Sequence, residues 1–123
     1  MTVIQTKDSP AAIGPYSQGF LAGGFIFTSG QIPLDPETGS VKGAGVAEQA
    51  QQAIANLKAV LEAGNSSLAK VIKTTCFLAS MDDFAAFNEV YARHFTGKPA
   101  RSCIAVKTLP RNVLCEIEAI AEI

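Results

Sequence analysis

The sequence predicts an α+β fold in which two helices pack on one face of a mixed β-sheet. Segments with the alternation or β-branched composition of strands surround two segments with the apolar periodicity of helices. Their order along the chain is strands, helix, strand, helix, strands, which fits an α+β architecture. No repeat, charge block or low-complexity tract divides the 123 residues. We therefore expect residues 1–123 to form a single domain.

Short strands and loops are expected in the N-terminal third of the chain. Residues 2–6 alternate as a strand does, and prolines and a Gly-Pro pair predict a loop over residues 8–15. The apolar runs 18–21 and 25–29 flank an Ala-Gly-Gly sequence and indicate a hairpin. Residues 30–45 contain two prolines and four glycines, which predicts a long loop.

The clearest helix is predicted over residues 46–63. Its apolar residues recur at helical spacing and form one stripe, and Gly64 follows as a C-terminal stop. The stripe consists of Ala47, Ala50, Ile54, Leu57 and Leu61.

A central strand over residues 71–79 and a second helix are predicted next. The strand is rich in β-branched residues, and Ser80 and Asp83 after it have the spacing of a capping box. The helix then carries an aromatic stripe, and two strands, 101–107 and 113–123, complete the chain around a turn at 109–112. The stripe consists of Phe84, Phe87, Tyr91 and Phe95.

Composition limits the classes of function. Charged residues make up 17% of the chain, below the roughly 25% usual for soluble domains, so part of the surface is expected to lie in an oligomer. The net charge is −1 and the ten Lys and Arg are scattered, which speaks against tight, non-specific binding of nucleic acid. No secretory signal or membrane span is recognisable, and three cysteines without C-x-x-C spacing indicate a cytoplasmic protein with reduced thiols. His94 is the only histidine, so no metal site is expected.

Period-two alternation assigns faces to the last two strands. It places Arg101 and Cys103 on one face, with Ser102 and Ile104 on the other. In the final strand it separates an apolar core face from a face that carries three carboxylates. The core face consists of Cys115, Ile117, Ala119, Ala121 and Ile123, and the other of Leu114, Glu116, Glu118, Ile120 and Glu122. The second face is either solvated or partly covered by a neighbouring subunit, and alternation does not choose between Glu116 and Glu118.

Arg101 is a candidate anion-binding residue. A guanidinium at the start of a strand offers a planar fork to a carboxylate, although its spacing fits an ordinary surface charge equally well. Cys103 is better interpreted as a small buried hydrophobe, because an activated thiolate needs a base or a positive field and His94 has no visible link to it. From the residues alone, the chain is a small cytoplasmic α+β domain with one possible anion-binding arginine.

Four motifs, in order, resemble those of the Rid family, also called the YjgF/YER057c/UK114 family. They are AIGPYSQG at 12–19, TSGQIPLDPETG at 28–39, PARSCIAV at 99–106 and EIEAIA at 116–121. The resemblance covers essentially the whole chain and is greatest to the RidA branch, whose members are enamine/imine deaminases. It implies a chorismate-mutase-like fold and a homotrimer with ligand clefts between subunits. The segment HFTGKPARS departs from the family pattern, because it is shorter than in many members. By the resemblance, this segment borders the cleft.

The resemblance also implies roles for individual residues. Arg101 matches the arginine that binds the substrate carboxylate, Cys103 a position whose backbone lines the cleft, and Glu116 an acidic residue that positions or activates water. The other matched cleft residues are Tyr16, Ser29, Gly30 and Asn88. The implied activity is cofactor-free hydrolysis of 2-imino acids to 2-keto acids and ammonia. An RNA-directed role (endoribonuclease or translation inhibitor) and a non-catalytic carboxylate sensor are the alternatives.

Overall fold

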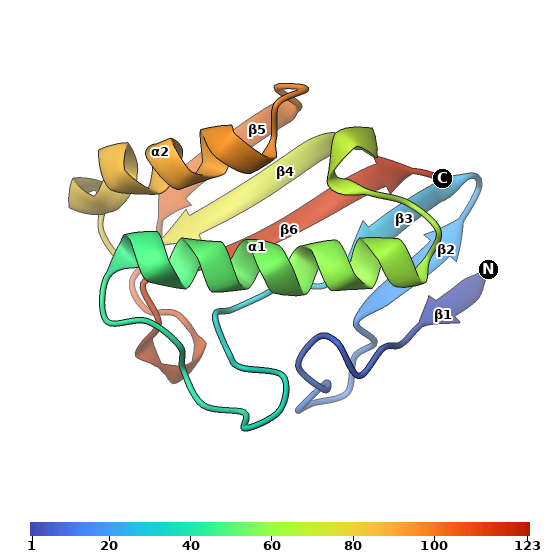
Figure 1. Ribbon diagram of the computed structural model, residues 1–123, viewed down its shortest axis with the longest axis horizontal. Coiled ribbons are helices and arrows are strands. Elements are labelled where there is room, and N and C mark those ends of the chain that lie inside the picture. Colours follow the sequence, from blue (N-terminus) through green and yellow to red (C-terminus); the bar gives the residue numbers. More distant parts are fainter.

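The computed structural model describes residues 1–123 and confirms the α+β fold: six strands form one mixed sheet, and both helices lie on the same face of it (Figure 1). The strand order is β1-β2-β3-β6-β4-β5. Only β4 and β5 pair in parallel, and the other pairs are antiparallel. The strands are β1 (Thr2–Ile4), β2 (Gly19–Ala22), β3 (Phe25–Thr28), β4 (Val71–Leu78), β5 (Ala100–Ala105) and β6 (Cys115–Glu122), and the helices are α1 (Val46–Ala63) and α2 (Phe84–His94).

The N-terminal hairpin forms as predicted, with Gly23 and Gly24 at its turn. Their φ angles of 60° and 82° lie in the left-handed region that glycine adopts without steric cost. Strand β1 ends at Ile4, two residues earlier than predicted. The Thr6 N–H donates to Gln18 Oε1 at 2.7 Å, so the chain leaves the sheet there and is held by a side chain.

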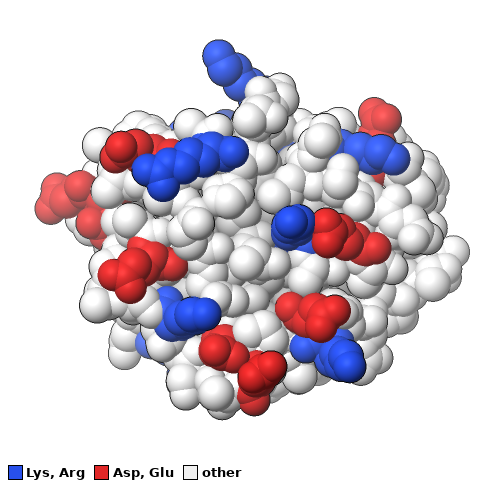
Figure 2. Space-filling model, viewed as in Figure 1, with Lys and Arg blue, Asp and Glu red and all other residues white.

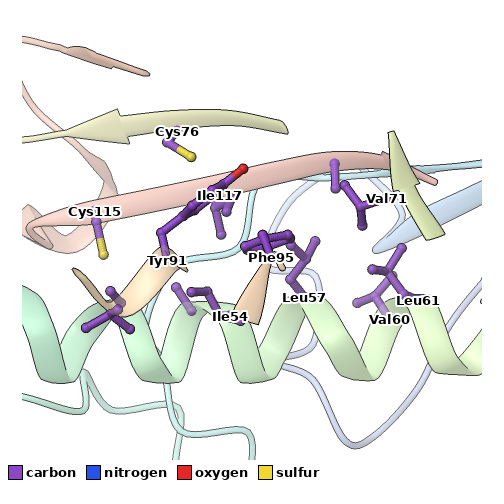
Figure 3. Packing of buried hydrophobic residues seen from close by; sticks show 14 of the residues in the cluster. Ile54, Leu57, Val60, Leu61, Val71, Cys76, Tyr91, Phe95, Cys115 and Ile117 are labelled. Carbon is purple, nitrogen blue, oxygen red and sulfur yellow. The ribbon is translucent and has the colours of Figure 1, made fainter. Parts of the chain in front are cut away.

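Helix α1 has the predicted bounds, and Gly64 follows it as its C-cap. Its buried face is rotated from the predicted stripe, because Val46, Ala53 and Val60 are also buried. Ala47 consequently lies outside the core and is exposed, contrary to the prediction. Figure 3 shows Ile54, Leu57, Val60 and Leu61 of this helix pointing toward the sheet.

Two polar residues of α1 tie the long loop to the helix. Asn56 Nδ2 donates to the carbonyls of Ile32 and Leu34 at 3.0 and 2.9 Å. Gln49 Nε2 donates to the Gly43 carbonyl at 3.1 Å. Buried amides that satisfy loop carbonyls fix the path of a segment that forms few ladder hydrogen bonds of its own.

The predicted capping box at Ser80 takes a different form. Ser80 caps a short 3-10 turn, Met81–Asp83, by accepting from the Asp82 N–H at 3.1 Å, and α2 begins only at Phe84. The predicted aromatic stripe of α2 is confirmed. The Tyr91 and Phe95 rings stack with centroids 4.4 Å apart and lie over the sheet (Figure 3).

Strand β6 runs between β3 and β4, and β5 is an edge strand. Burial alternates along β6 as predicted, with Cys115, Ile117, Ala119 and Ala121 in the core. Ile123, also predicted to be in the core, follows the end of the strand and is 44% exposed.

The other face of the sheet has no helix over it (Figure 1). The register places Val3, Phe20, Phe27 and Ile120 in one row across this open face. Val3 is 53% and Phe27 44% exposed. On the helix-covered side, charges of both signs are interspersed and no large patch of one sign forms (Figure 2). No helix is both long enough and apolar enough to cross a membrane.

Candidate functional site

The residues singled out in the sequence form two groups on opposite faces of the sheet. Arg101, Asn88 and Cys103 lie on the helix-covered face. Gly30 and Glu116 contact each other on the open face, with Ser29 and Tyr16 nearby in the chain segments that lead to them. We call the first the arginine cleft, a hollow of about 430 Å³ lined by Asn88, Tyr91, Ala92, Phe95, Thr96, Lys98, Pro99 and Arg101. We call Tyr16, Ser29, Gly30 and Glu116 the glutamate group.

Arg101 is held in the cleft by helix α2. Its Nη1 donates to Asn88 Oδ1 at 2.8 Å. Its guanidinium carbon lies 4.6 Å from the centroid of the Tyr91 ring and 5.7 Å from that of Phe84. A cation over an aromatic face gains about 0.5–2 kcal/mol. These contacts orient the guanidinium, but a neutral amide and two rings leave its charge available to an anion.

The ring below Arg101 is itself anchored. The Tyr91 hydroxyl and the Thr74 hydroxyl of β4 share a hydrogen bond of 2.7 Å in the core. Burial is the main cause of a raised pKa for Tyr91. A neutral, hydrogen-bonded phenol fixes the ring plane on which the guanidinium stacks.

Cys103 lies beside Cys76 in the parallel β4–β5 register and packs against the core. Burial raises the pKa of the Cys103 thiol, and the nearby Arg101 charge only partly opposes this. Burial likewise raises the pKa of Cys76 and of Cys115 to about 12. All three cysteines are free thiols with little thiolate character near neutral pH.

Glu116 is the half-buried carboxylate of the open face. Burial raises its pKa above the ordinary 4.5, and the charge of Glu118 adds to the effect. The side chain crosses Gly30 so closely that a Cβ added there would stand 1.8 Å from Glu116 Oε2. Glycine at position 30 therefore makes room for this carboxylate.

Ser29 and Tyr16 flank this pair. Ser29 Oγ donates to the Ser17 carbonyl at 2.5 Å, which uses its proton and leaves its lone pairs free to accept. The Tyr16 hydroxyl accepts from the Ile13 N–H at 3.4 Å, and the side chain is 48% exposed. Tyr16 and Gly30 line the same small hollow.

A single chain does not bring the two groups together. In the sheet, Glu116 of β6 pairs with Phe77 of β4, which pairs in turn with Ile104 of β5. Ile104 lies three residues along β5 from Arg101, so its side chain is on the opposite face of the sheet. Two strand spacings and three residues of rise separate the Cα atoms of Arg101 and Glu116 by about 14 Å. One small substrate cannot contact both side chains of the same chain.

Sequence reasoning missed the neighbours of Arg101. Phe84 and Tyr91 were interpreted as core residues only, although Asn88 shares their helix face at the i, i+4, i+7 spacing. That polar residue within an aromatic stripe was the available signal. Lys98 of the cleft was not singled out either.

No group of three His, Cys, Asp or Glu side chains is arranged to hold a metal ion. His94, at the end of α2, shares a hydrogen bond with Gln51 of α1. Burial lowers the pKa of His94, and the charges of Arg93 and Lys58 lower it further.

The fold and the cleft define a class: a small α+β domain with an arginine-lined cleft at the edge of a mixed sheet. The family model described as "Endoribonuclease L-PSP" matches residues 6–123. The chain therefore belongs to this family, the Rid (YjgF) family, as the motifs indicated.

Relatives in this family carry different names. The chain is 49% identical to the "2-iminobutanoate/2-iminopropanoate deaminase" of Escherichia coli, covering 96% of this chain and 94% of that protein. It is 48% identical to a Lactococcus lactis protein named as a regulator, AldR, covering 100% and 98% of the two chains. The crystal structure of E. coli TdcF with bound serine matches at a TM-score of 0.95 and 44% identity, covering 100% and 99%.

Proposed function

We propose that this protein hydrolyses reactive 2-imino acids, such as 2-iminopropanoate and 2-iminobutanoate, to 2-keto acids and ammonia. The observation that carries the proposal is the guanidinium of Arg101, oriented by Asn88 and Tyr91 and with no carboxylate among the residues that line its cleft. A relative with 49% identity is named for this reaction. Another relative binds serine, an amino acid with the same α-carboxylate.

Arg101 is assigned to the substrate carboxylate. A guanidinium pairs with a carboxylate through two parallel N–H···O bonds, which fixes the plane of the substrate as well as its position. A hydrogen bond to a charged group contributes roughly 1.5–3 kcal/mol. Loss of Arg101 should then lower kcat/KM by about 10- to 100-fold.

Glu116 is assigned to the water that attacks. Its carboxylate takes a proton from water while the oxygen forms a bond to the imine carbon, and the proton is passed on to the nitrogen. The carbinolamine then loses ammonia as the C=O bond forms. A carboxyl whose pKa lies above the ordinary 4.5 is a better proton acceptor near neutral pH than an exposed one.

The proposal further requires two copies of the chain, since Arg101 and Glu116 lie on opposite faces of one sheet. We assign Arg101 of one copy and Glu116 of its neighbour to the same cleft, in a homotrimer. The apolar row on the open face and the low content of charged residues favour such an assembly. Cys103 and Gly30 would then line the cleft with their backbones.

The reaction is tested by producing the imine with a threonine or serine dehydratase and following its disappearance. Wild type should accelerate hydrolysis, Arg101→Ala should lose 10- to 100-fold, and Arg93→Ala, an exposed arginine of α2, should not differ from wild type. If wild type gives no acceleration, the deaminase proposal fails. If Arg101→Ala retains full activity, Arg101 is not the carboxylate anchor.

Shared clefts are tested by complementation. Arg101→Ala and Glu116→Ala chains are mixed in equal amounts, denatured and refolded together. If the site is shared, each mixed trimer contains one cleft with both intact residues, which is about a quarter of all clefts after random reassembly, and activity returns. Wild type refolded in the same way is the control, and activity of the mixture that stays at the level of the separate variants would contradict the shared site. Size-exclusion chromatography with light scattering measures the trimer itself.

The second candidate is a regulatory carboxylate-binding protein, which the name of the Lactococcus lactis relative favours. It uses the same cleft, so it predicts binding of 2-keto acids without acceleration of imine hydrolysis. The family description favours an endoribonuclease. RNA cleavage that survives repurification and disappears in Glu116→Ala would support that activity instead.

A further inference from the structure

The connection between α2 and β5 holds a lysine at the rim of the arginine cleft. Only residues 96–99 separate Phe95 from β5, and Lys98 is the third of them. The Lys98 φ angle is 51°, in the left-handed region, and its N–H donates to the Phe95 carbonyl at 3.1 Å. Pro99 follows, and a proline disfavours the right-handed helical conformation for the residue before it. The backbone therefore sets the direction in which the Lys98 side chain leaves the loop.

Charge in the arginine cleft is of one sign. Lys98 and Arg101 both line it, and the other lining residues are Asn88, Tyr91, Ala92, Phe95, Thr96 and Pro99, none of which is charged. Two cations that share one concave surface raise its positive potential and favour an anionic ligand. A single carboxylate at Arg101 would leave the second charge unused.

The cleft that holds the two cations also has an apolar wall. The stacked rings of Tyr91 and Phe95, with centroids 4.4 Å apart, form part of the cleft lining. Lys98 and Arg101 are three residues apart, so their Cα atoms lie at most about 10 Å from each other. The long, exposed side chain of Lys98 can therefore reach toward a ligand that is bound at Arg101. This arrangement suits a short carbon chain with an acidic group at each end.

We propose that the arginine cleft selects 2-imino acids that carry a second carboxylate, the kind formed from amino dicarboxylic acids. Arg101 takes the α-carboxylate, the methylene groups lie against the aromatic wall, and Lys98 takes the distal carboxylate. The role of Arg101 in this inference rests on the proposed function. Lys98 is thus a specificity-determining residue, which contacts the distal carboxylate and not the imine carbon.

The test compares two 2-keto acids of equal chain length, 2-oxopentanedioate and 2-oxopentanoate, as stable product ligands. Their dissociation constants are measured by calorimetry at low ionic strength. Wild type should bind the diacid about fivefold more tightly, since an exposed lysine pair is screened by water and is weaker than a buried one. Added salt should reduce this preference.

Variants separate the contributions of the two cations. Lys98→Gln should abolish the preference for the diacid while its affinity for the monoacid stays within twofold, and Lys98→Arg should keep the preference. Lys42→Gln, in the long loop outside the cleft, is the matched control and should not differ from wild type. Lys98 is exposed, so these variants are expected to fold; circular dichroism verifies this.

Either of two results would overturn the inference: equal binding of the two acids by wild type, or an unchanged preference in Lys98→Gln. Failure of the proposed function is distinguishable from both. In that case Arg101→Ala would leave the affinity for each acid unchanged, or wild type would bind the acids without accelerating imine hydrolysis.

Discussion

Replacing Gly30 by alanine tests the geometry around Glu116. The new Cβ would stand 1.8 Å from Glu116 Oε2, 2.8 Å from its Cδ and 3.1 Å from its Cγ. Ordinary contact begins at 3.4 Å, so the carboxylate must retreat by about 1.6 Å. The displaced atoms belong to the end of a flexible side chain. We therefore expect the free energy of unfolding to fall by only about 1 kcal/mol.

Activity should suffer far more than stability. A misplacement of about 1 Å in a reacting group can cost on the order of 100-fold in rate, so Gly30→Ala is expected to lower kcat about that much in the dehydratase-coupled assay. Binding of 2-keto acids should change less than kcat, because Arg101, which anchors the carboxylate, is not displaced by the substitution. Gly45→Ala, where a Cβ meets nothing within 4 Å, is the matched control.

A double-mutant cycle shows whether Glu116 causes the strain. In a Glu116→Ala background the carboxylate is absent, so Gly30→Ala should no longer destabilise the protein in urea unfolding. An undiminished cost in that background, or full activity of Gly30→Ala alone, would refute the reasoning.

Three further predictions concern side chains of the two groups and their neighbours. The pKa of Glu116 is raised in the folded state, so the protonated carboxyl stabilises the fold below pH 4.5. This contribution is lost as the pH rises through the folded-state pKa. Glu116→Gln should remove that part of the pH dependence of thermal unfolding. Glu118→Gln should shift the acidic limb of the pH–kcat/KM profile to lower pH, by removing a neighbouring negative charge. Thr74→Val leaves the Tyr91 hydroxyl without its partner, which should cost about 1–3 kcal/mol in urea unfolding and weaken ligand binding at Arg101; unchanged values would contradict the anchoring role of this pair.

Local patterns in the sequence predicted the elements well. The 3.6-residue period over 46–63 gave the bounds of α1, and period-two alternation gave the faces of β6. Two errors in the bounds of elements have different causes. The side chain of Gln18 accepts from the Thr6 N–H, and β1 ends at Ile4; no window of neighbouring residues shows this contact. Ser80 accepts from the N–H of Asp82, two residues on, and caps a 3-10 turn before α2; the contact is local, but the capping-box spacing does not distinguish the two kinds of helix.

The site was less predictable than the fold. The motifs identified the family and its residues, but the partners of Arg101 come from α2, thirteen residues away in the case of Asn88. Such contacts depend on how α2 packs against the sheet. The residue pattern of α2 or of β5 alone does not specify this packing.

Alternation determined from the sequence that Arg101 and Cys103 share a face and that Glu116 lies opposite the core residues of its own strand. It could not relate the two strands, because a period of two is a property of one strand at a time. The pairing of β4 in parallel with β5 and antiparallel with β6 decided that Arg101 lies under α2 while Glu116 lies on the open face. Long-range hydrogen bonds set that register, so only the tertiary structure could place the two residues on opposite faces of the sheet.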